Sequence, residues 1–160
     1  MKKIFLIAIC ILIIGCQKEE NIYTIKANIE ENILKHKDYN NLSSCKIDEI
    51  NNTITIELIN NSEEEQEWFK TNISNSNKLI FKQGKEIKQE ELTYVYNYIN
   101  DYINSNGQIE NYTGHYIDEI CNSVVVSLIE NNQKHQNNFK QNIIDSNLIE
   151  LKKGNYGTDQ

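Results

Sequence analysis

Residues 47–59 read IDEINNTITIELI, and residues 117–129 read IDEICNSVVVSLI. Seven of these thirteen positions are identical, and the central differences mostly exchange one β-forming residue for another. The match continues upstream without a gap, since the apolar residues at 22, 25, 29 and 33 fall on those at 92, 95, 99 and 103. An apolar pattern that keeps one register across seventy positions indicates an internal duplication.

Each copy predicts the same order of elements. A helix comes first, because apolar residues recur at three- and four-residue steps over 22–33 and 92–103. Two short strands follow, separated by an Asx-rich turn at 48–52 or 118–122. A second helix comes next, with Ser62 or Asn132 as its N-cap. The last element is a strand over 78–82 or 147–152, which ends at Gly84 or Gly154.

The predicted fold class is therefore α+β, with two tandem α-β-β-α-β repeats of about 70 residues. A chain of that length is close to the lower limit for an independent core. We therefore expect the two repeats to pack on each other as a pseudo-symmetric pair. Whether they share one sheet is open at this point.

The N-terminus has the pattern of an export signal. Lys2 and Lys3 precede an apolar run over 4–14, followed by Gly15 and Cys16. Eleven helical residues reach only about 16 Å, roughly half of a 30 Å hydrocarbon core. The run is too short to span a bilayer and fits a removable signal peptide. The segment 13–16 resembles the lipobox of bacterial lipoproteins, which implies that Cys16 is acylated after cleavage.

These observations divide the chain into a signal peptide at 1–15, a lipid-anchored linker at 16–20, a first repeat at 21–90 and a second repeat at 91–160. The linker residues 17–20 resemble the export tag of Bacteroidetes surface lipoproteins, and a plain solvated linker is the alternative. We expect a protein of the bacterial cell envelope, anchored to a membrane through the lipid on Cys16. The outer membrane or the cell surface is favoured over the inner membrane.

The charge of the chain limits its classes of partner, and its cysteines raise the question of a disulfide. The chain has 16 basic against 23 acidic residues and a formal net charge of −7. An acidic surface repels phosphate backbones, so we expect no nucleic-acid partner. After processing, Cys45 and Cys121 remain in an oxidising compartment, where disulfides persist. They form either a disulfide or two separate buried thiols.

Residues that could carry chemistry are few. His36, His115 and His135 each occur in one copy only, and we interpret them as surface polar residues. Asp48 and Asp118 occur in both copies and could serve acid–base chemistry or hold a cation. Their position before Asn-rich turns favours capping of the turns instead. We expect no catalytic residue, no metal site and no cofactor.

A set of tyrosines marks the first helix of the second copy. Tyr96 and Tyr102 fall on the predicted buried face of the helix, whereas Tyr94 and Tyr98 fall at its edge. The first copy has no aromatic residue at the two edge positions. Tyrosine contributes a large contact area at a small loss of rotamer freedom. Tyr94 and Tyr98 are therefore candidates for partner binding, with packing at the boundary of the core as the alternative.

Several of the duplicated segments resemble tandem modules that precede chymotrypsin-fold serine proteases in some bacteria. They resemble more distantly the pro-region of α-lytic-type proteases. The segments are 117–119 with 124–126, then 139–140, then 145–150, together with their first-copy partners. The resemblance implies a folding helper or an inhibitor. The sequence contains no Gly-Asp-Ser-Gly nucleophile segment, so such a role implies a protease encoded separately.

Three functions remain at this stage. The first is a non-enzymatic lipoprotein whose paired repeats bind another envelope or extracellular protein. The second is an inhibitor or folding helper that acts in trans on a serine protease. The third is an enzyme or a metal-dependent binder built on Asp48, Asp118 and His115, and we rank it last.

Overall fold

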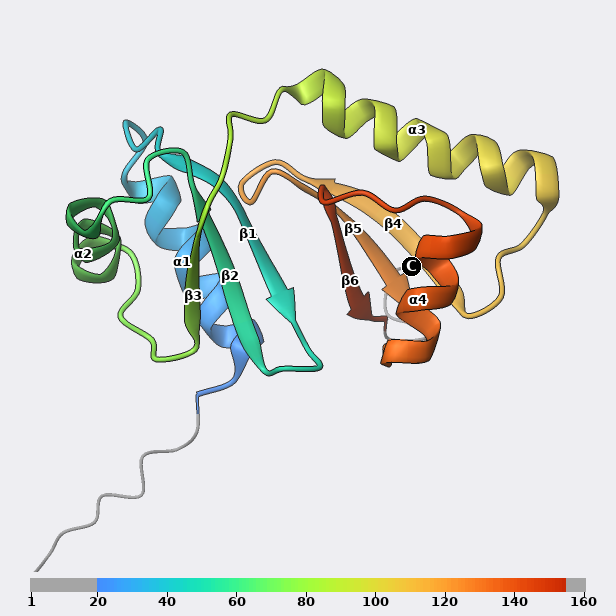
Figure 1. Cartoon of the computed structure of the whole chain (residues 1–160), viewed down its shortest axis with the longest axis horizontal. Coiled ribbons are helices and arrows are strands. Elements are labelled where there is room, and N and C mark those ends of the chain that lie inside the picture. The colour runs from blue at the N-terminus through green and yellow to red at the C-terminus, as the bar shows by residue number, and fades with distance from the viewer. Residues whose placement is uncertain (1–19, 155–160) are drawn as a thin grey trace, which may run out of the picture.

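The computed structural model describes residues 20–154 and folds them into two copies of one module (Figure 1). No helix within this range is long and apolar enough to cross a membrane. The first copy consists of α1 (Ile22–Lys35), β1 (Leu42–Asp48), β2 (Thr53–Leu58), α2 (Glu63–Asn72) and β3 (Leu79–Gln83). The second copy consists of α3 (Gln89–Asn106), β4 (Tyr112–Asp118), β5 (Ser123–Leu128), α4 (Gln133–Asn142) and β6 (Ile149–Lys153).

The α+β fold with two tandem repeats is confirmed, and each repeat forms its own three-stranded sheet. The middle strand pairs antiparallel with the strand before it and parallel with the strand after it. The register is the same in both copies, since Cys45 pairs with Ile56 and His115 with Val126. The first helix of each copy extends a few residues beyond the predicted range.

Polar residues shape the turns and helix ends as the sequence predicts. Asn52 and Asn122 have positive φ values of 54° and 46°, a conformation that asparagine tolerates well. The side chains of Ser62 and Asn132 accept hydrogen bonds from backbone amides in the first turns of α2 and α4. Gly84 follows β3 so closely beside Ser43 that a Cβ atom would collide with that side chain. These local signals fix where each element starts and stops.

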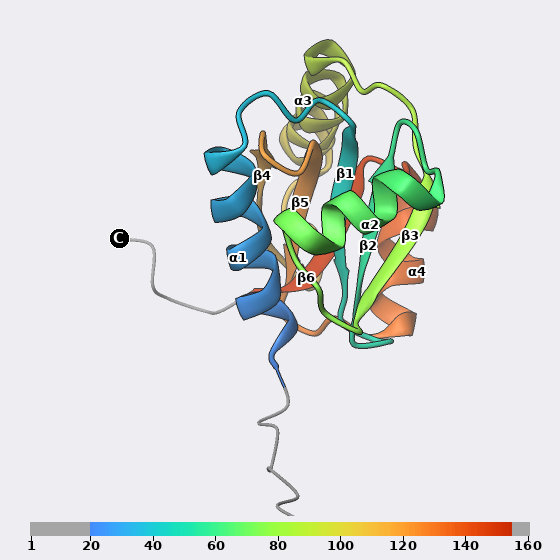
Figure 2. The ribbon, with the colours of Figure 1, turned by 90° about the vertical axis from the view of Figure 1, so that its left-hand side faces the viewer.

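Each copy has a separate core on one face of its sheet. In Figure 2, α2 lies in front of the first sheet and α1 lies to the left of it. The helices contribute Ile25, Ile29 and Phe69 to a core with the apolar residues of β2. In the second copy, α3 and α4 cover the corresponding face of β4, β5 and β6. Because successive side chains along a strand point to opposite faces of the sheet, the residues between these core positions face away from the helices.

The second sheet uses its opposite face to contact the first copy. Val125 lies between two core residues of β5 and is fully buried, although alternation places it on the other face. Its neighbour on β6 is Glu150, which α1 of the first copy reaches through Lys26. The corresponding first-copy residue, Thr55, is half-buried. The two copies therefore present different surfaces to each other.

Candidate functional site

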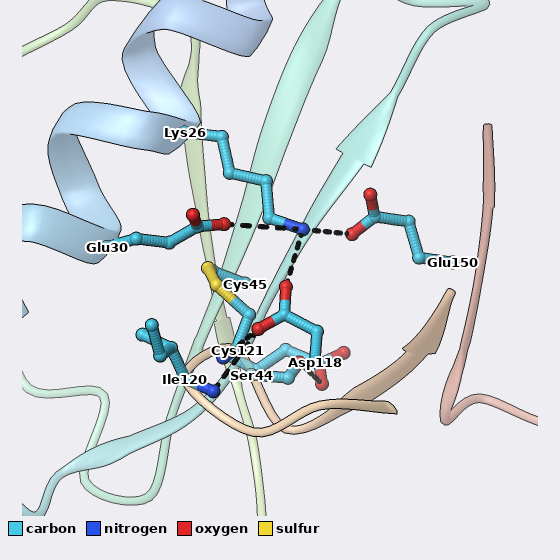
Figure 3. The surroundings of a disulfide bond; sticks show 9 residues. Lys26, Glu30, Ser44, Cys45, Asp118, Ile120, Cys121 and Glu150 are labelled. Atoms are coloured by element: carbon cyan, nitrogen blue, oxygen red, sulfur yellow. Dashed lines mark hydrogen bonds and ion pairs between the residues drawn. A yellow bond between two sulfur atoms is a disulfide. The ribbon is translucent and has the colours of Figure 1, made fainter. Parts of the chain in front are cut away.

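A cluster of charged side chains surrounds a disulfide at the junction of the two copies (Figure 3). On one side of the junction are α1 and β1, and on the other are the β4–β5 turn and β6. A two-fold axis would bring like surfaces together, whereas this junction joins unlike ones. The copies share one topology but meet asymmetrically.

A disulfide between Cys45 and Cys121 joins the two copies covalently. Cys45 lies in β1, and Cys121 lies in the turn between β4 and β5. Both side chains are fully buried, and the Cα–Cα distance of 4.8 Å lies within the range usual for disulfides. The backbone amide of Cys45 also donates a hydrogen bond to the carbonyl oxygen of Cys121 at 3.2 Å. The partner positions in the repeat hold His115 and Asn51, so neither cysteine is duplicated.

Lys26 places a buried positive charge beside the disulfide. Its Nζ lies 2.8 Å from Glu150 Oε2 and 3.0 Å from Asp118 Oδ2, and both carboxylates belong to the second copy. Glu30 on the next turn of α1 is 3.8 Å away. The side chains of Lys26 and Glu150 are 8% and 1% exposed. Charges this deeply buried are tolerated because they are paired and hydrogen-bonded.

The titration of the cluster follows from its burial. Burial raises the pKa of the Glu150 carboxyl, and attraction to Lys26 offsets only part of the rise. Burial acts to lower the pKa of Lys26, but the carboxylates of Glu150 and Asp118 outweigh it and raise the pKa above its ordinary value. Lys26 is therefore positively charged over the whole physiological pH range. The cluster therefore holds the two copies together through a buried cation and its carboxylate partners.

The same cluster contains a group of metal-ligand type, formed by Glu30, Asp118 and Cys121 within 4.8 Å of one another. The Cys121 sulfur belongs to the disulfide and is not a thiolate, which is the form that binds metals. The Lys26 ammonium already lies between the two carboxyl groups as the cation of the site. The residues present fit an ion pair better than a metal ion.

A second set of polar contacts lies beside this cluster. Glu49, in the β1–β2 turn, accepts hydrogen bonds from the Lys153 amide at 2.9 Å and from Asn131 Nδ2 at 2.7 Å. The hydroxyl of Tyr23 also donates to Glu49. On β1, Lys46 Nζ donates to the Asn147 carbonyl oxygen at 2.6 Å. The junction therefore combines a covalent bond, buried ion pairs and hydrogen bonds.

Sequence reasoning missed Lys26 and Glu150. The available signal was the loss of repeat symmetry, since Lys26 aligns with Tyr96 and Glu150 aligns with Ile80. A lysine beside the apolar stripe of α1 and a glutamate near the start of β6 each differ in kind from the aligned residue of the other copy. Such breaks mark positions whose environment differs between the copies.

Asp48 and Asp118 accept hydrogen bonds within their own turns, as the sequence predicts. Asp48 Oδ1 accepts from the Asn51 amide at 3.0 Å, and Asp118 Oδ1 accepts from the Cys121 amide at 3.0 Å. Only Asp118 additionally pairs with Lys26. Two residues that are equivalent in the repeat thus have different surroundings.

His115 lies elsewhere, between β4 and α3. Its Nε2 donates to the Tyr96 carbonyl oxygen at 3.1 Å, so Nδ1 accepts the hydrogen bond from the Tyr112 hydroxyl. Burial lowers its pKa, and the bond to Tyr96 offsets part of that effect. Among residues 20–154, no contact joins His115, Asp48 and Asp118 to one another. His115 therefore links α3 to β4 through a hydrogen bond.

Tyr94 and Tyr98 lie on the outer side of α3. Their side chains are 66% and 41% exposed, and their ring centroids are 6.4 Å apart. Tyr96 and Tyr102 pack against the second core, as the sequence predicts. The other proposed site residue, Cys16, lies outside the described residues, as do the signal peptide and most of the linker.

Comparison with known proteins places the chain in a family. No curated protein matches it. The family described as Pro-like C-terminal domain matches twice, over residues 20–84 and again over residues 90–154. Each match covers one copy of the module from the start of its first helix to the end of its last strand. The chain therefore belongs to the Pro-like C-terminal domain family and contains two tandem copies of that domain.

Proposed function

We propose that this protein is a non-enzymatic lipoprotein of the bacterial cell envelope that binds a protein partner. The observation that carries the proposal is the pair Tyr94 and Tyr98, which places two exposed rings close together on one face of α3. Aromatic residues on a rigid support are favoured contact residues, because few rotamers are lost on binding.

The anchor of this body is the proposed lipid on Cys16. Six residue steps separate Cys16 from the start of α1 at Ile22, and a fully extended chain of that length reaches about 20 Å. The module would therefore stay close to the membrane surface. Two or more acyl chains give lasting attachment, at roughly 0.8 kcal/mol per buried methylene.

The anchor is tested by expression of the wild type and Cys16→Ala in a bacterial host, followed by membrane fractionation and mass spectrometry. The wild type should be found in the membrane fraction with an acylated N-terminal cysteine. The variant should lack the acyl groups and leave the membrane fraction. Recovery of acyl-free wild-type protein would remove the anchor from the proposal.

The binding surface is tested by affinity capture from native envelopes, with Tyr94→Ser/Tyr98→Ser as the variant. Tyr116→Ser serves as a matched control, because Tyr116 is 47% exposed but lies in β4 and not in α3. The double variant should lose a partner that the wild type and the control retain. Equal recovery by all three proteins would contradict this surface.

An inhibitor or folding helper that acts in trans on a serine protease is the second candidate. The observation that favours it is the family itself, whose description as pro-like agrees with the resemblance to protease pro-regions. Addition of the purified protein to a chymotrypsin-fold protease from the same organism tests it. A changed rate of proteolysis or a higher yield on refolding would support the idea, and unchanged values would exclude it.

A further inference from the structure

The second copy contains a cavity that the first copy fills with its own side chains. The cavity has a volume of about 160 Å³ and lies between the end of α3, the loop after it and α4. Its floor is apolar and consists of Leu128, Phe139 and Ile143, all of which are buried. Amide side chains such as Asn138 and Asn142 form the rim. A cavity of about 150 Å³ is large enough to hold a benzene ring.

The duplication shows what fits at this place. Asn138 and Ile109 line the cavity of the second copy, and the aligned residues of the first copy are Trp68 and Tyr39. The rings of Trp68 and Tyr39 stack with centroids 4.4 Å apart and planes 12° apart, and both pack against the first core. Trp68 and Asn138 occupy the same position in helices of equal length. The first copy therefore supplies an aromatic ring where the second has only a short amide.

His135 also lines the cavity. Its Nδ1 is buried and lies 3.6 Å from Glu130 Oε2, so this nitrogen is not open to a ligand in the cavity. The aligned residue of the first copy, Glu65, accepts a hydrogen bond from Asn41 at 2.9 Å.

The surrounding charge restricts the ligand further. Glu110 belongs to the rim, and Glu130 lies beside His135. These two carboxylates disfavour an anionic ring. A neutral aromatic ring satisfies the volume, the apolar floor and the charge of the cavity together.

We infer that the second copy binds one uncharged aromatic ring, such as an indole or a phenol, at the place that Trp68 occupies in the first copy. The ring lies on Phe139 and Ile143. The ligand is a free indole-type compound or a tryptophan or tyrosine side chain of a partner. The cavity lies near the C-terminal end of α3, so the site is independent of Tyr94 and Tyr98.

The test is a titration with 5-fluoroindole followed by fluorine NMR, in parallel with a titration with N-acetyltryptophan amide. Asn138→Trp fills the cavity as the first copy does and should weaken binding at least roughly tenfold. Asn137→Trp is the matched control, because the neighbouring residue on α4 does not line this cavity.

The two ligands distinguish the two sources. Tighter binding of the amide indicates a protein side chain, and tighter binding of the free ring indicates a small molecule. Absence of binding by the wild type at millimolar ligand would overturn the inference. Equal binding by the wild type and Asn138→Trp would also overturn it. Asn142→Phe fills the cavity from one helical turn further on, so the conclusion does not depend on the folding of a single variant.

Discussion

The two copies of the module fold alike, yet the residues that differ between them gather in two places. One is the junction, where Lys26, Cys45 and Glu150 have no counterpart of the same kind in the other copy. The other is the space beside the second helix, which Trp68 fills in the first copy and Asn138 leaves open in the second. Core positions keep the fold, whereas divergent positions determine how the copies meet and what the second one can hold.

The largest effect should follow from removal of the buried cation at the junction. Lys26→Met leaves Glu150 and Asp118 without their partner in a buried site. We expect the free energy of unfolding to fall by roughly 3–5 kcal/mol in a denaturant titration. Lys35→Met is the control, because Lys35 and Glu31 are 60% and 66% exposed, and its effect should stay below about 1 kcal/mol.

A second variant separates charge from packing at the same place. Lys26→Met/Glu150→Leu replaces most of the ion cluster with apolar groups, and we expect it to recover much of the lost stability. A double variant as unstable as Lys26→Met alone would mean that the geometry of the ion pair matters more than the unpaired charge.

Loss of the disulfide should have the next largest effect. Cys45 and Cys121 are separated by 76 residues in the sequence, so the crosslink restricts a long loop in the unfolded chain. Cys45→Ala/Cys121→Ala should lower the free energy of unfolding by about 2–5 kcal/mol. Wild type treated with reductant should match this variant. An unfolding midpoint that reductant leaves unchanged would contradict the prediction.

Trp68→Asn gives the first copy the residue that the second copy has, and so tests the origin of the cavity. We expect a loss of about 2 kcal/mol, below the 3–5 kcal/mol range of fully buried aromatics, because Trp68 is half-buried. The number of fluoroindole sites should rise from one to two by fluorine NMR. A single site in both proteins would show that the two copies differ by more than this residue.

The smallest expected effect concerns pH and His115, which stands where the first copy has Cys45. Burial lowers the pKa of His115 in the folded protein below its ordinary value of about 6.5. The unfolded chain therefore binds more protons, and stability is lost as the pH falls below about 6.5 toward the lowered pKa. The free energy of unfolding should fall by up to about 1 kcal/mol between pH 7 and pH 5.5.

His115→Phe identifies this contribution. Glu150 acts in the opposite direction, because its raised pKa makes stability fall as the pH rises above about 4.5. Only the difference between the wild type and His115→Phe therefore isolates the histidine. The same pH dependence in both proteins would assign it to other groups.

Much of the fold follows from local sequence signals. The apolar spacing that includes Ile25 and Ile29 predicts the first helix. The match of residues 47–59 with 117–129 then predicts the same order of elements for the second copy. The caps at Ser62 and Asn132 and the turns after Asp48 and Asp118 were also predictable. These features depend on neighbours within a few residues, which the sequence shows directly.

The candidate sites were less predictable. The two cysteines could pair or stay apart, and nothing in their spacing decided between the two. Lys26 and Glu150 are 124 residues apart and belong to elements that predict ordinary surface charge. The cavity results from a missing large side chain, and no residue pattern within one copy predicts such a space. Only the comparison of Trp68 with Asn138 reveals it.

The sequence by itself determined that one α-β-β-α-β module occurs twice, with its core positions, turns and helix caps. Periodicity and capping are local properties, and both copies carry the same apolar pattern and the same kinds of capping residue. The tertiary structure decided that unlike surfaces meet, that Cys45 bonds to Cys121 and that Lys26 lies between Glu150 and Asp118. Contacts between distant residues depend on how two finished modules fit together, because shape and charge select one arrangement from many.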